Sequence, residues 1–533
     1  MSDESHLGEE IAYDNGNLHI EQVSLEALAN DPDVSTPAYI YSLALMKRRY
    51  AEFKAAMNDV DPNAMVCYAV KSLSNQAVLR EFANMKAGAD LVSGGELLRA
   101  LRAGFDGSRI VFSGLGKTRE DIDLAIKENV QINVESVSEL EVVNARARAQ
   151  RARVALRLNP QLEAMRGNLG QITTGKPDSK FGIPWRTVKD LLKNLANNFA
   201  HIDLVGVSVH IGSNMEVEGD GKTSFGETFG FLKTKVVPAL RKAGVTRPIL
   251  DLGGGVGIDY SQTPHQQKNL AGMPPNRWLA PYKELVEEYF GELARDRRIQ
   301  LVFEPGRFLS GEAGVLLTKV LYVKRETENA TRRVNARKPF EIRFVIVDAG
   351  MNDLMRPSLY GAYHHIVPLR YAEPGDGDDN VDICGPVCET TDSFMRPTRE
   401  WLKRYDTLFV DEAIKGDNRK ARSARLLQAT ASVFGEVEPM YRDRPRRLKG
   451  RRRTYEYFMK RRFPSSVMEG HLVAILNAGA YGAVMSSEYN SRPLIPEVLV
   501  HGSRYAVIRK RPSIDELIAR DCNPVWKRGG RRS

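Results

Sequence analysis

The chain has 533 residues, of which 42% are hydrophobic and 27% charged, with a formal net charge of +10. This composition is typical of a soluble globular protein, and the length suits two domains or a large barrel with an added module. The N-terminus, "MSDESHLGEE", is polar and acidic, and no apolar run approaches the length of a membrane span. The sequence therefore predicts neither a signal peptide nor a membrane protein, and we expect a cytoplasmic enzyme.

The four cysteines, Cys67, Cys384, Cys388 and Cys522, have no regular spacing. They do not make a disulfide framework, and Cys384 with Cys388 has no second pair of ligands nearby that would suggest zinc. We predict reduced thiols and no metal site.

The positive charge is concentrated in residues 395–468, which hold 20 Lys or Arg and nine Asp or Glu, so the rest of the chain is close to neutral. Any nucleic-acid binding would therefore concern this segment alone. Its stretch "RRLKGRRRTYEYFMKRR" combines cations with aromatic rings, as nucleic-acid-binding segments do. A solvated insertion is the favoured interpretation, which makes nucleic acid an unlikely partner, and an arm for nucleic acid or another anionic surface is the alternative.

A short strand is predicted over residues 35–42, and eight apolar, β-branched runs follow it: 64–70, 89–93, 109–114, 130–136, 153–159, 203–212, 248–255 and 299–306. Amphipathic helical patterns lie between them: 75–86, 95–104, 118–128, 136–150, 186–197, 227–244 and 280–296. Eight strands that alternate with helices predict a closed parallel (β/α)8 barrel of the TIM type, in the α/β class. An open doubly wound sheet is the alternative, but it more usually has about five or six strands.

Beyond the last of these runs the pattern changes to strands without intervening helices, at 314–326, 340–350, 471–479 and 504–511. These predict a C-terminal antiparallel β domain that the N-terminal strand joins. The predicted domains are an N-terminal segment packing with the β domain (1–58), a cofactor-binding barrel (59–315), the β domain (316–394 and 469–533) and the basic insertion (395–468).

Chemically distinctive residues stand at the predicted carboxyl ends of the barrel strands, where active sites of such barrels lie. They are Lys71, Arg157, His210, Gly253 to Gly255, Glu304 and Arg307. The amine of Lys71 either extends into water or is held in a dry pocket, where its pKa falls and it becomes a nucleophile.

Each of the other residues also has a structural explanation: a tight turn for the glycines, an ion pair for Glu304 and Arg307, and a core position for His210. Together they supply an amine, a carboxylate, a glycine loop for a phosphate and a flat ring. These are the groups that pyridoxal phosphate (PLP) requires.

These residues belong to motifs that resemble those of the diaminopimelate decarboxylases, PLP enzymes of the alanine-racemase fold. The motifs follow one another in family order: "YAVKSLSN", "ADLVSGGEL", "HIGSN", "GGGVGIDY", "EPGRFL", "VDAGMNDLMRPSLYGAYH", "GPVCETTDSF" and "NAGAYGAVMSSEYNSRP". They cover nearly the whole chain except the basic segment. The resemblance implies the decarboxylation of meso-2,6-diaminopimelate to L-lysine and CO2, which is the last step of lysine biosynthesis.

The resemblance also implies roles for residues around PLP. Lys71 binds the aldehyde of the cofactor, His210 stacks on its ring, and Glu304 pairs with the pyridine nitrogen. Ser213, Gly253, Gly254 and Gly255 bind the phosphate. The remaining residues assigned to the cofactor are Asp90, Arg157, Gly306, Arg307 and Tyr481.

On the substrate side, the resemblance assigns Arg307, Arg356 and Tyr360 to the carboxylates, and Tyr481 to both cofactor and substrate. It also implies a homodimer in which Cys388 and Glu389 are donated across the interface. Cys388 would return a proton to Cα, and Glu389 would bind the far amino group. The implied catalytic residues are thus Lys71, His210 and Cys388.

Two features depart from the family pattern. The basic insertion replaces a short loop close to Cys388, and His471 stands where the family usually has an acidic residue. Related decarboxylases of ornithine, arginine or carboxynorspermidine, or a homologue inactivated by the insertion, are the alternative readings. Arg356 favours diaminopimelate, because an arginine suits a substrate with a distal carboxylate better than a diamine precursor.

Overall fold

A computed structural model describes residues 10–160, 179–215, 217, 219–260, 276–328, 340–371, 378–394 and 461–526. Most of the predicted basic insertion, residues 395–460, lies outside these ranges. The hypotheses about that insertion therefore concern residues that are not described.

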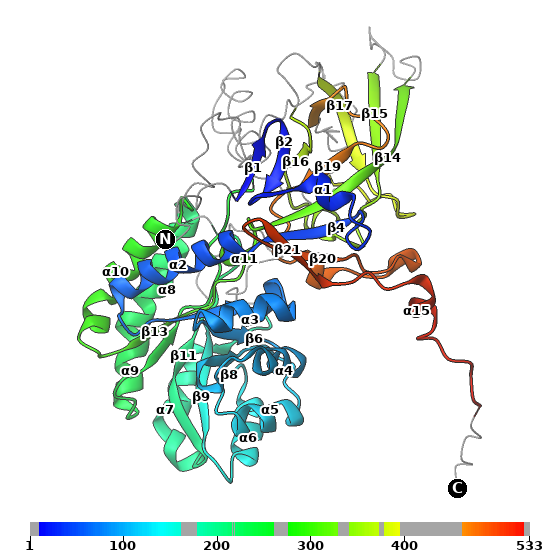
Figure 1. The fold of residues 1–533 in the computed structure, drawn as a ribbon. Helices are drawn as coiled ribbons and strands as arrows, with labels where there is room; N and C mark the ends of the chain where they lie inside the picture. The colour runs from blue at the N-terminus through cyan, green and yellow to red at the C-terminus, as the bar shows by residue number, and fades with distance from the viewer. Residues whose placement is uncertain are drawn as a thin grey trace, which may run out of the picture.

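Eight parallel strands form a closed barrel: β5 (Met65–Ala69), β6 (Gly88–Leu91), β7 (Ile110–Phe112), β8 (Gln131–Val134), β9 (Ala152–Asn159), β11 (Ile202–Ser208), β12 (Ile249–Asp251) and β13 (Gln300–Phe303). Each pairs with the next in this order, and β13 pairs with β5, which closes the sheet (Figure 1). Each strand overlaps one of the eight predicted apolar runs. The predicted barrel is confirmed, and the open doubly wound alternative is wrong.

Helices surround the barrel: α3 (Gln76–Asn84), α4 (Gly94–Ala103), α5 (Arg119–Lys127), α6 (Val137–Arg146), α7 (Trp185–Asn198), α8 (Gly219–Phe231), α9 (Val237–Lys242) and α10 (Leu279–Arg295). Several begin at a side chain that caps the backbone. The Thr118 side chain accepts a hydrogen bond from the Asp121 amide, and Asp121 caps in return. Such caps satisfy amides that have no partner inside the helix, so local sequence fixes where these helices start.

The N-terminal segment divides between the two domains, although we predicted that it packs with the β domain. Only β4 (Ala38–Ser42) joins the β sheet, whereas α2 (Leu43–Val60) covers the barrel. Tyr50 of α2 packs edge to face on Phe82 of α3, with 6.0 Å between the ring centres. Phe53 of α2 packs on Phe303 of β13, with 5.9 Å between the ring centres. A π-helical turn (Leu232–Val236) joins α8 and α9 into one segment between β11 and β12, so the helices from α3 to α10 fill seven positions around the barrel. The chain passes from β13 into the β domain without a long helix, and α2 fills the eighth position.

The β domain contains a sheet in the order β18-β17-β15-β14-β4-β20-β21, and β19 bridges β14 and β16. The strands are β14 (Gly314–Glu328), β15 (Phe340–Val347), β16 (Ile366–Pro368), β17 (Asp378–Cys384), β18 (Arg461–Pro464), β19 (Leu472–Ile475), β20 (Glu497–His501) and β21 (Arg504–Arg509). Most pairs are antiparallel as predicted, but β15–β17 and β4–β20 are parallel. β18 comes from the last residues of the segment 395–468.

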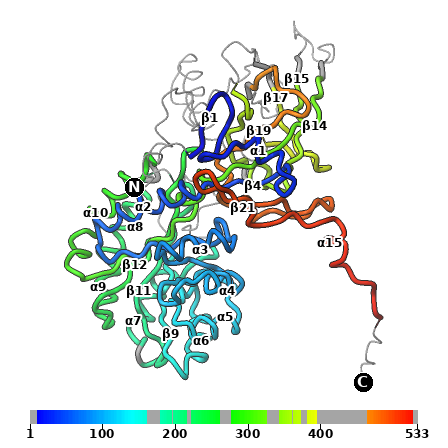
Figure 2. The backbone as a smooth tube through the Cα atoms, viewed as in Figure 1, coloured from blue at the N-terminus to red at the C-terminus, as the bar shows by residue number. Residues whose placement is uncertain are grey.

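Smaller elements complete the molecule. A three-stranded sheet of β1 (Ile11–Asp14), β2 (Asn17–Ile20) and β3 (Val23–Ser24), with α1 (Leu25–Ala29), shares a hydrophobic core with the β domain. Residues after β21, including α15 (Ile514–Ile518), project from the body (Figures 1 and 2). In the described part of the chain, no helix is both long and apolar enough to cross a membrane.

Candidate active site

Lys71 lies in a 3-10 turn (Val70–Ser72) directly after β5, at the carboxyl end of the barrel. Its amine donates a hydrogen bond to Asp90 Oδ2 of β6 at 2.5 Å. The Asp90 side chain is fully buried, and that of Lys71 is 31% exposed, so this ion pair lines the mouth of the barrel rather than its outer surface. The structure thus brings together two residues that we assigned to the cofactor.

The pKa of Lys71 does not follow the dry-pocket expectation in this structure. Burial alone would lower it, but the negative charges of Asp90 and Glu304 outweigh burial and hold the pKa above its ordinary value. The amine is therefore an ammonium here. It must lose a proton before it can attack an aldehyde, and Asp90 is the carboxylate in contact with it.

Glu304 follows β13 and is 6% exposed, and Asp251, the last residue of the neighbouring strand β12, is 1% exposed. Burial, and next the charges of Asp251 and Asp90, raise the pKa of Glu304 well above its usual range. Its Oε1 atom is buried and has no hydrogen-bond partner among the described residues. A buried polar atom normally has a partner, so Oε1 offers a position for a ligand group that can hydrogen-bond to it.

The three glycines form a tight loop after β12. Gly253 and Gly255 have φ angles of +68° and +107°, which disfavour other residues. An added Cβ on Gly254 would lie 2.3 Å from the Glu304 carbonyl oxygen. Backbone packing therefore accounts for these glycines without a ligand. The Met215 amide donates to the Gly255 carbonyl at 2.8 Å, which holds the Ser213 loop beside them.

Two arginines and two tyrosines converge next to this loop. Arg307, the first residue of α11 (Arg307–Ser310), donates to Ser213 Oγ at 3.1 Å and to the Tyr260 hydroxyl. Its guanidinium lies 4.8 Å from the centre of the Tyr481 ring, and that of Arg356 lies 5.2 Å from the centre of the Tyr260 ring. Both arginines are buried. Sequence reasoning missed Tyr260, whose place at the end of "GGGVGIDY" was the available signal.

Tyr481 links the β domain to the barrel. Its amide donates to the Ser72 carbonyl at 2.8 Å, and its φ is +57°, which is uncommon for a bulky residue. Gly306 packs closely against the end of β5, since a Cβ added to Gly306 would lie 2.9 Å from the Cβ of Ala69. Tyr360 ends the helix α12 (Arg356–Tyr360), but its side chain is outside what the structure describes.

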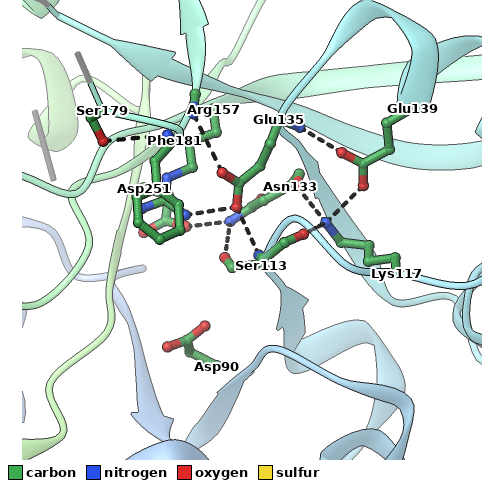
Figure 3. A network of polar contacts seen from close by, with 12 residues as sticks. Asp90, Ser113, Lys117, Asn133, Glu135, Glu139, Arg157, Ser179, Phe181 and Asp251 are labelled. Carbon is green, nitrogen blue, oxygen red and sulfur yellow. Dashed lines mark hydrogen bonds and ion pairs between the residues drawn. The ribbon is translucent and has the colours of Figure 1, made fainter. Parts of the chain in front are cut away.

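Arg157 and His210 complete the barrel mouth. Arg157 of β9 donates to Glu135 at 2.7 Å, and its guanidinium lies 4.8 Å from the centre of the Phe181 ring (Figure 3). Burial, with the charges of Arg157 and Lys71, holds the pKa of His210 well below its usual value. A neutral imidazole suits stacking on a ring, because it carries no charge that would require solvation.

Cys388 and Glu389 lie apart from this cluster. Both are exposed, on the loop after β17. The Cys388 amide donates to Asn490 Oδ1 at 3.0 Å, and Glu389 accepts from the Thr390 amide at 3.0 Å. Their contribution to a partner subunit stays a prediction. Within the described ranges, no group of three or more His, Cys, Asp or Glu could hold a metal ion.

Comparison with known proteins agrees with this geometry. Residues 43–311 match the family described as "Pyridoxal-dependent decarboxylase, pyridoxal binding domain". The chain is 34% identical to the diaminopimelate decarboxylase of Zymomonas mobilis over 516 residues, which cover 96% of this chain and 98% of that protein. The chain belongs to the diaminopimelate decarboxylase family. The resemblance inferred from the motifs is therefore confirmed.

Solved structures of diaminopimelate decarboxylases have the same fold. The M. jannaschii enzyme in complex with L-lysine is 27% identical, with a TM-score of 0.73 over 97% of this chain and 99% of that one. The Helicobacter pylori enzyme complexed with L-lysine is 28% identical, with a TM-score of 0.66 over 93% of this chain and 98% of that one.

The residues of this diaminopimelate decarboxylase family member fit PLP. Oε1 of Glu304 is a buried polar atom that could pair with the ring nitrogen, and Lys71 provides the amine for the aldehyde. Ser213 and the adjoining glycine loop could hold the phosphate, with Arg307 in hydrogen-bond contact with Ser213. These groups come from four different strand ends, which the closed barrel brings to one side.

Proposed function

We propose that the chain is a PLP-dependent carboxy-lyase that converts meso-2,6-diaminopimelate to L-lysine and CO2, the last step of lysine biosynthesis. The single observation that carries the proposal is the convergence of the Lys71 amine, the Glu304 oxygen that has no hydrogen-bond partner among the described residues, and the buried pair Arg307 and Arg356. The names of the relatives point to the same reaction. When bound, PLP supplies an electron sink for the electron pair that departing CO2 leaves behind.

The chain's own residues hold the reacting groups. Lys71 anchors the cofactor and Asp90, in contact with its amine, takes the proton that the amine must lose. The neutral ring of His210 packs against the cofactor without placing a second positive charge on it. Ser213 and the glycine loop bind the phosphate, and Arg157 is fixed by Glu135 at the rim.

The two arginines select the substrate. Arg307 and Arg356 bind the carboxylates of diaminopimelate, together with Tyr360, because a guanidinium and a carboxylate form two parallel hydrogen bonds. The rings of Tyr260 and Tyr481 lie under both guanidinium groups, which allows two like charges to remain close. A substrate without the second carboxylate forgoes the bidentate contact with one of these buried arginines, which disfavours ornithine and arginine.

Arg356→Gln is expected to raise KM for meso-diaminopimelate by about 30- to 150-fold, because a buried charged hydrogen bond is worth roughly 2–3 kcal/mol. The loss of preference over ornithine, measured as the ratio of kcat/KM values, should be of the same size. Arg370→Gln is the matched control, because Arg370 is 79% exposed and pairs with Glu26 on the surface. An unchanged substrate preference in Arg356→Gln would remove Arg356 from the site.

The enzyme is proposed to work as a homodimer in which Cys388 and Glu389 complete the partner's site. Cys388 would return the proton to Cα, and Glu389 would bind the far amino group. Support comes from the exposure of both residues and from a pocket of about 350 Å³ nearby, lined by Met351, Asn352, Met355, Ser487 and Tyr489. Thr391 contacts Met351 at the edge of this pocket. A cytoplasmic location also stays a prediction.

Mixed dimers test this arrangement. Lys71→Ala and Cys388→Ala should each be inactive alone, because one lacks the amine and the other the donated thiol. Unfolding and refolding them together should restore about one quarter of parental activity, since half the dimers then hold one intact site. Refolding each variant alone is the control. If Cys388 serves its own chain instead, a mixed dimer holds no intact site, because one subunit lacks the amine and the other lacks the thiol, and the refolded mixture should stay inactive.

A second set of mixed dimers also distinguishes a Cys388 thiol donated to the partner's site from one that serves its own chain. Parental chains mixed with the double variant Lys71→Ala, Cys388→Ala form dimers that hold no intact site if the thiol is donated, and one intact site if it is not. We expect activity below that of the parental chain mixed with Lys71→Ala. Equal activity in both mixtures would contradict the donated thiol.

A further inference from the structure

The Tyr260 side chain lies at the junction between the barrel and the β domain. The backbone before it is held to the barrel, because Asn276 Nδ2 donates to the Gly257 carbonyl at 2.8 Å and the Ile258 side chain is only 1% exposed. On the β-domain side, His364 packs edge to face on the Tyr260 ring, with 5.2 Å between the ring centres. The Tyr260 ring is therefore supported by both domains.

His364 is itself held in one orientation. It is fully buried, and its Nδ1 atom lies 3.0 Å from the Leu476 carbonyl oxygen. Because a carbonyl oxygen only accepts hydrogen bonds, Nδ1 carries the hydrogen of this contact. The Tyr260 ring therefore cannot shift toward His364 without displacing a close-packed side chain.

The hydroxyl and the ring of Tyr260 contact two different arginines. The hydroxyl oxygen accepts a hydrogen bond from Arg307 Nη1, whereas Arg307 Nη2 donates to Ser213 Oγ at 3.1 Å. The centre of the Tyr260 ring lies 5.2 Å from the Arg356 guanidinium and 5.7 Å from that of Arg307. One side chain thus touches both groups that we assigned to the substrate carboxylates.

Two buried cations beside one ring repel each other. Arg307 is 8% exposed and Arg356 is 6% exposed, so water screens this repulsion poorly. The face of a tyrosine ring attracts a cation, and an accepting hydroxyl fixes the direction of a guanidinium. Tyr481 also faces both guanidinium groups, at 4.8 and 6.0 Å, but the hydroxyl contact with Arg307 belongs to Tyr260.

We propose that Tyr260 is a positioning residue that holds Arg307 through its hydroxyl and Arg356 through its ring, and so makes the site specific for substrates with a carboxylate at each end. The identity of that substrate, meso-diaminopimelate, rests on the proposed function, whereas the placement of the two arginines does not. Guanidinium groups that are fixed before binding need less ordering when a dicarboxylate arrives, so Tyr260 acts on substrate affinity rather than on the chemical step.

Tyr260→Phe removes the hydroxyl and keeps the ring. It is expected to raise KM for meso-diaminopimelate about 10-fold, with kcat within about twofold of the parent, because a hydrogen bond to a charged group is lost. Tyr260→Leu also removes the ring and should raise KM about 50-fold. In an Arg356→Gln background, Tyr260→Leu should have no larger effect than Tyr260→Phe, because the ring no longer has Arg356 to hold. A general loss of packing would not remove this difference.

Calorimetry with two unreactive ligands separates the inference from the proposed reaction. Pimelate has two carboxylates and heptanoate has one, and neither has an amine that could react with PLP. The full-length chain with PLP should bind pimelate at least about 10-fold more tightly than heptanoate, and Tyr260→Leu should lose most of this preference. If Tyr260→Leu does not fold, Tyr260→Phe takes its place in both measurements, with a smaller expected loss.

Tyr13→Phe is the matched control, because the Tyr13 hydroxyl also forms a hydrogen bond, to the Pro368 carbonyl, but Tyr13 lies in β1 of the three-stranded sheet. It should keep the parental KM and the parental preference for pimelate. A parental KM in the Tyr260 variants, or a parent that binds pimelate no better than heptanoate, would overturn the inference. A preference for pimelate that depends on Tyr260, in a chain that does not decarboxylate meso-diaminopimelate, would support the inference and refute the proposed function.

Discussion

Replacing Lys71 by alanine is expected to reduce lysine formation at least about 1,000-fold, because Lys71 supplies the amine that binds the aldehyde in the proposed function. The visible absorption of the lysine-bound cofactor should disappear at the same time. The variant should also lose about 2–4 kcal/mol of stability, because Asp90 is fully buried and Lys71 is its ion-pair partner. Activity, absorption and urea unfolding measure the three effects.

Lys71→Arg distinguishes the covalent role of the Lys71 amine from the effect of its positive charge next to Asp90. Arginine keeps a cation next to Asp90 but is not deprotonated at neutral pH, so activity should fall as far as in Lys71→Ala while most of the stability returns. Appreciable turnover in Lys71→Arg would show that this side chain acts only through its charge, and the covalent role of Lys71 would have to be abandoned.

Glu304→Gln is expected to lower kcat about 100-fold or more with a small change in KM, because the neutral amide cannot hold a proton on the ring nitrogen. Glu312→Gln is a suitable control. Glu312 is equally buried but pairs with Arg49 at 2.8 Å, away from the glycine loop, so its loss should reduce stability rather than the turnover of folded enzyme. A Glu304→Gln enzyme with parental kcat would place the ring nitrogen elsewhere.

The barrel could be predicted because each of its strands is a short apolar run and several of its helices have local start signals such as Thr118. The position of α2 could not be predicted in the same way. Its packing on Phe82 and Phe303 depends on closure of the barrel, which joins β5 to β13 across most of the domain. The two parallel pairs of the β domain also depend on contacts between distant segments.

Residues at strand ends could be located from sequence, since the barrel brings all carboxyl ends together. The partners that set their charge could not. Asn133 and Asp251 are 118 residues apart and meet only across the barrel, and Tyr260 gains its place from two arginines on other segments. The pKa of Lys71 rises for the same reason, because Asp90 and Glu304 reach it from neighbouring strands.

The most direct test of the account is an assay of the purified full-length chain with PLP and meso-diaminopimelate, in which CO2 and lysine are both measured. We predict equal amounts of lysine and CO2 from the parent, and neither from Lys71→Ala. This result would also show that residues 395–468 are compatible with activity. A parent that binds PLP but releases CO2 from ornithine or arginine, and not from meso-diaminopimelate, would contradict the substrate assignment.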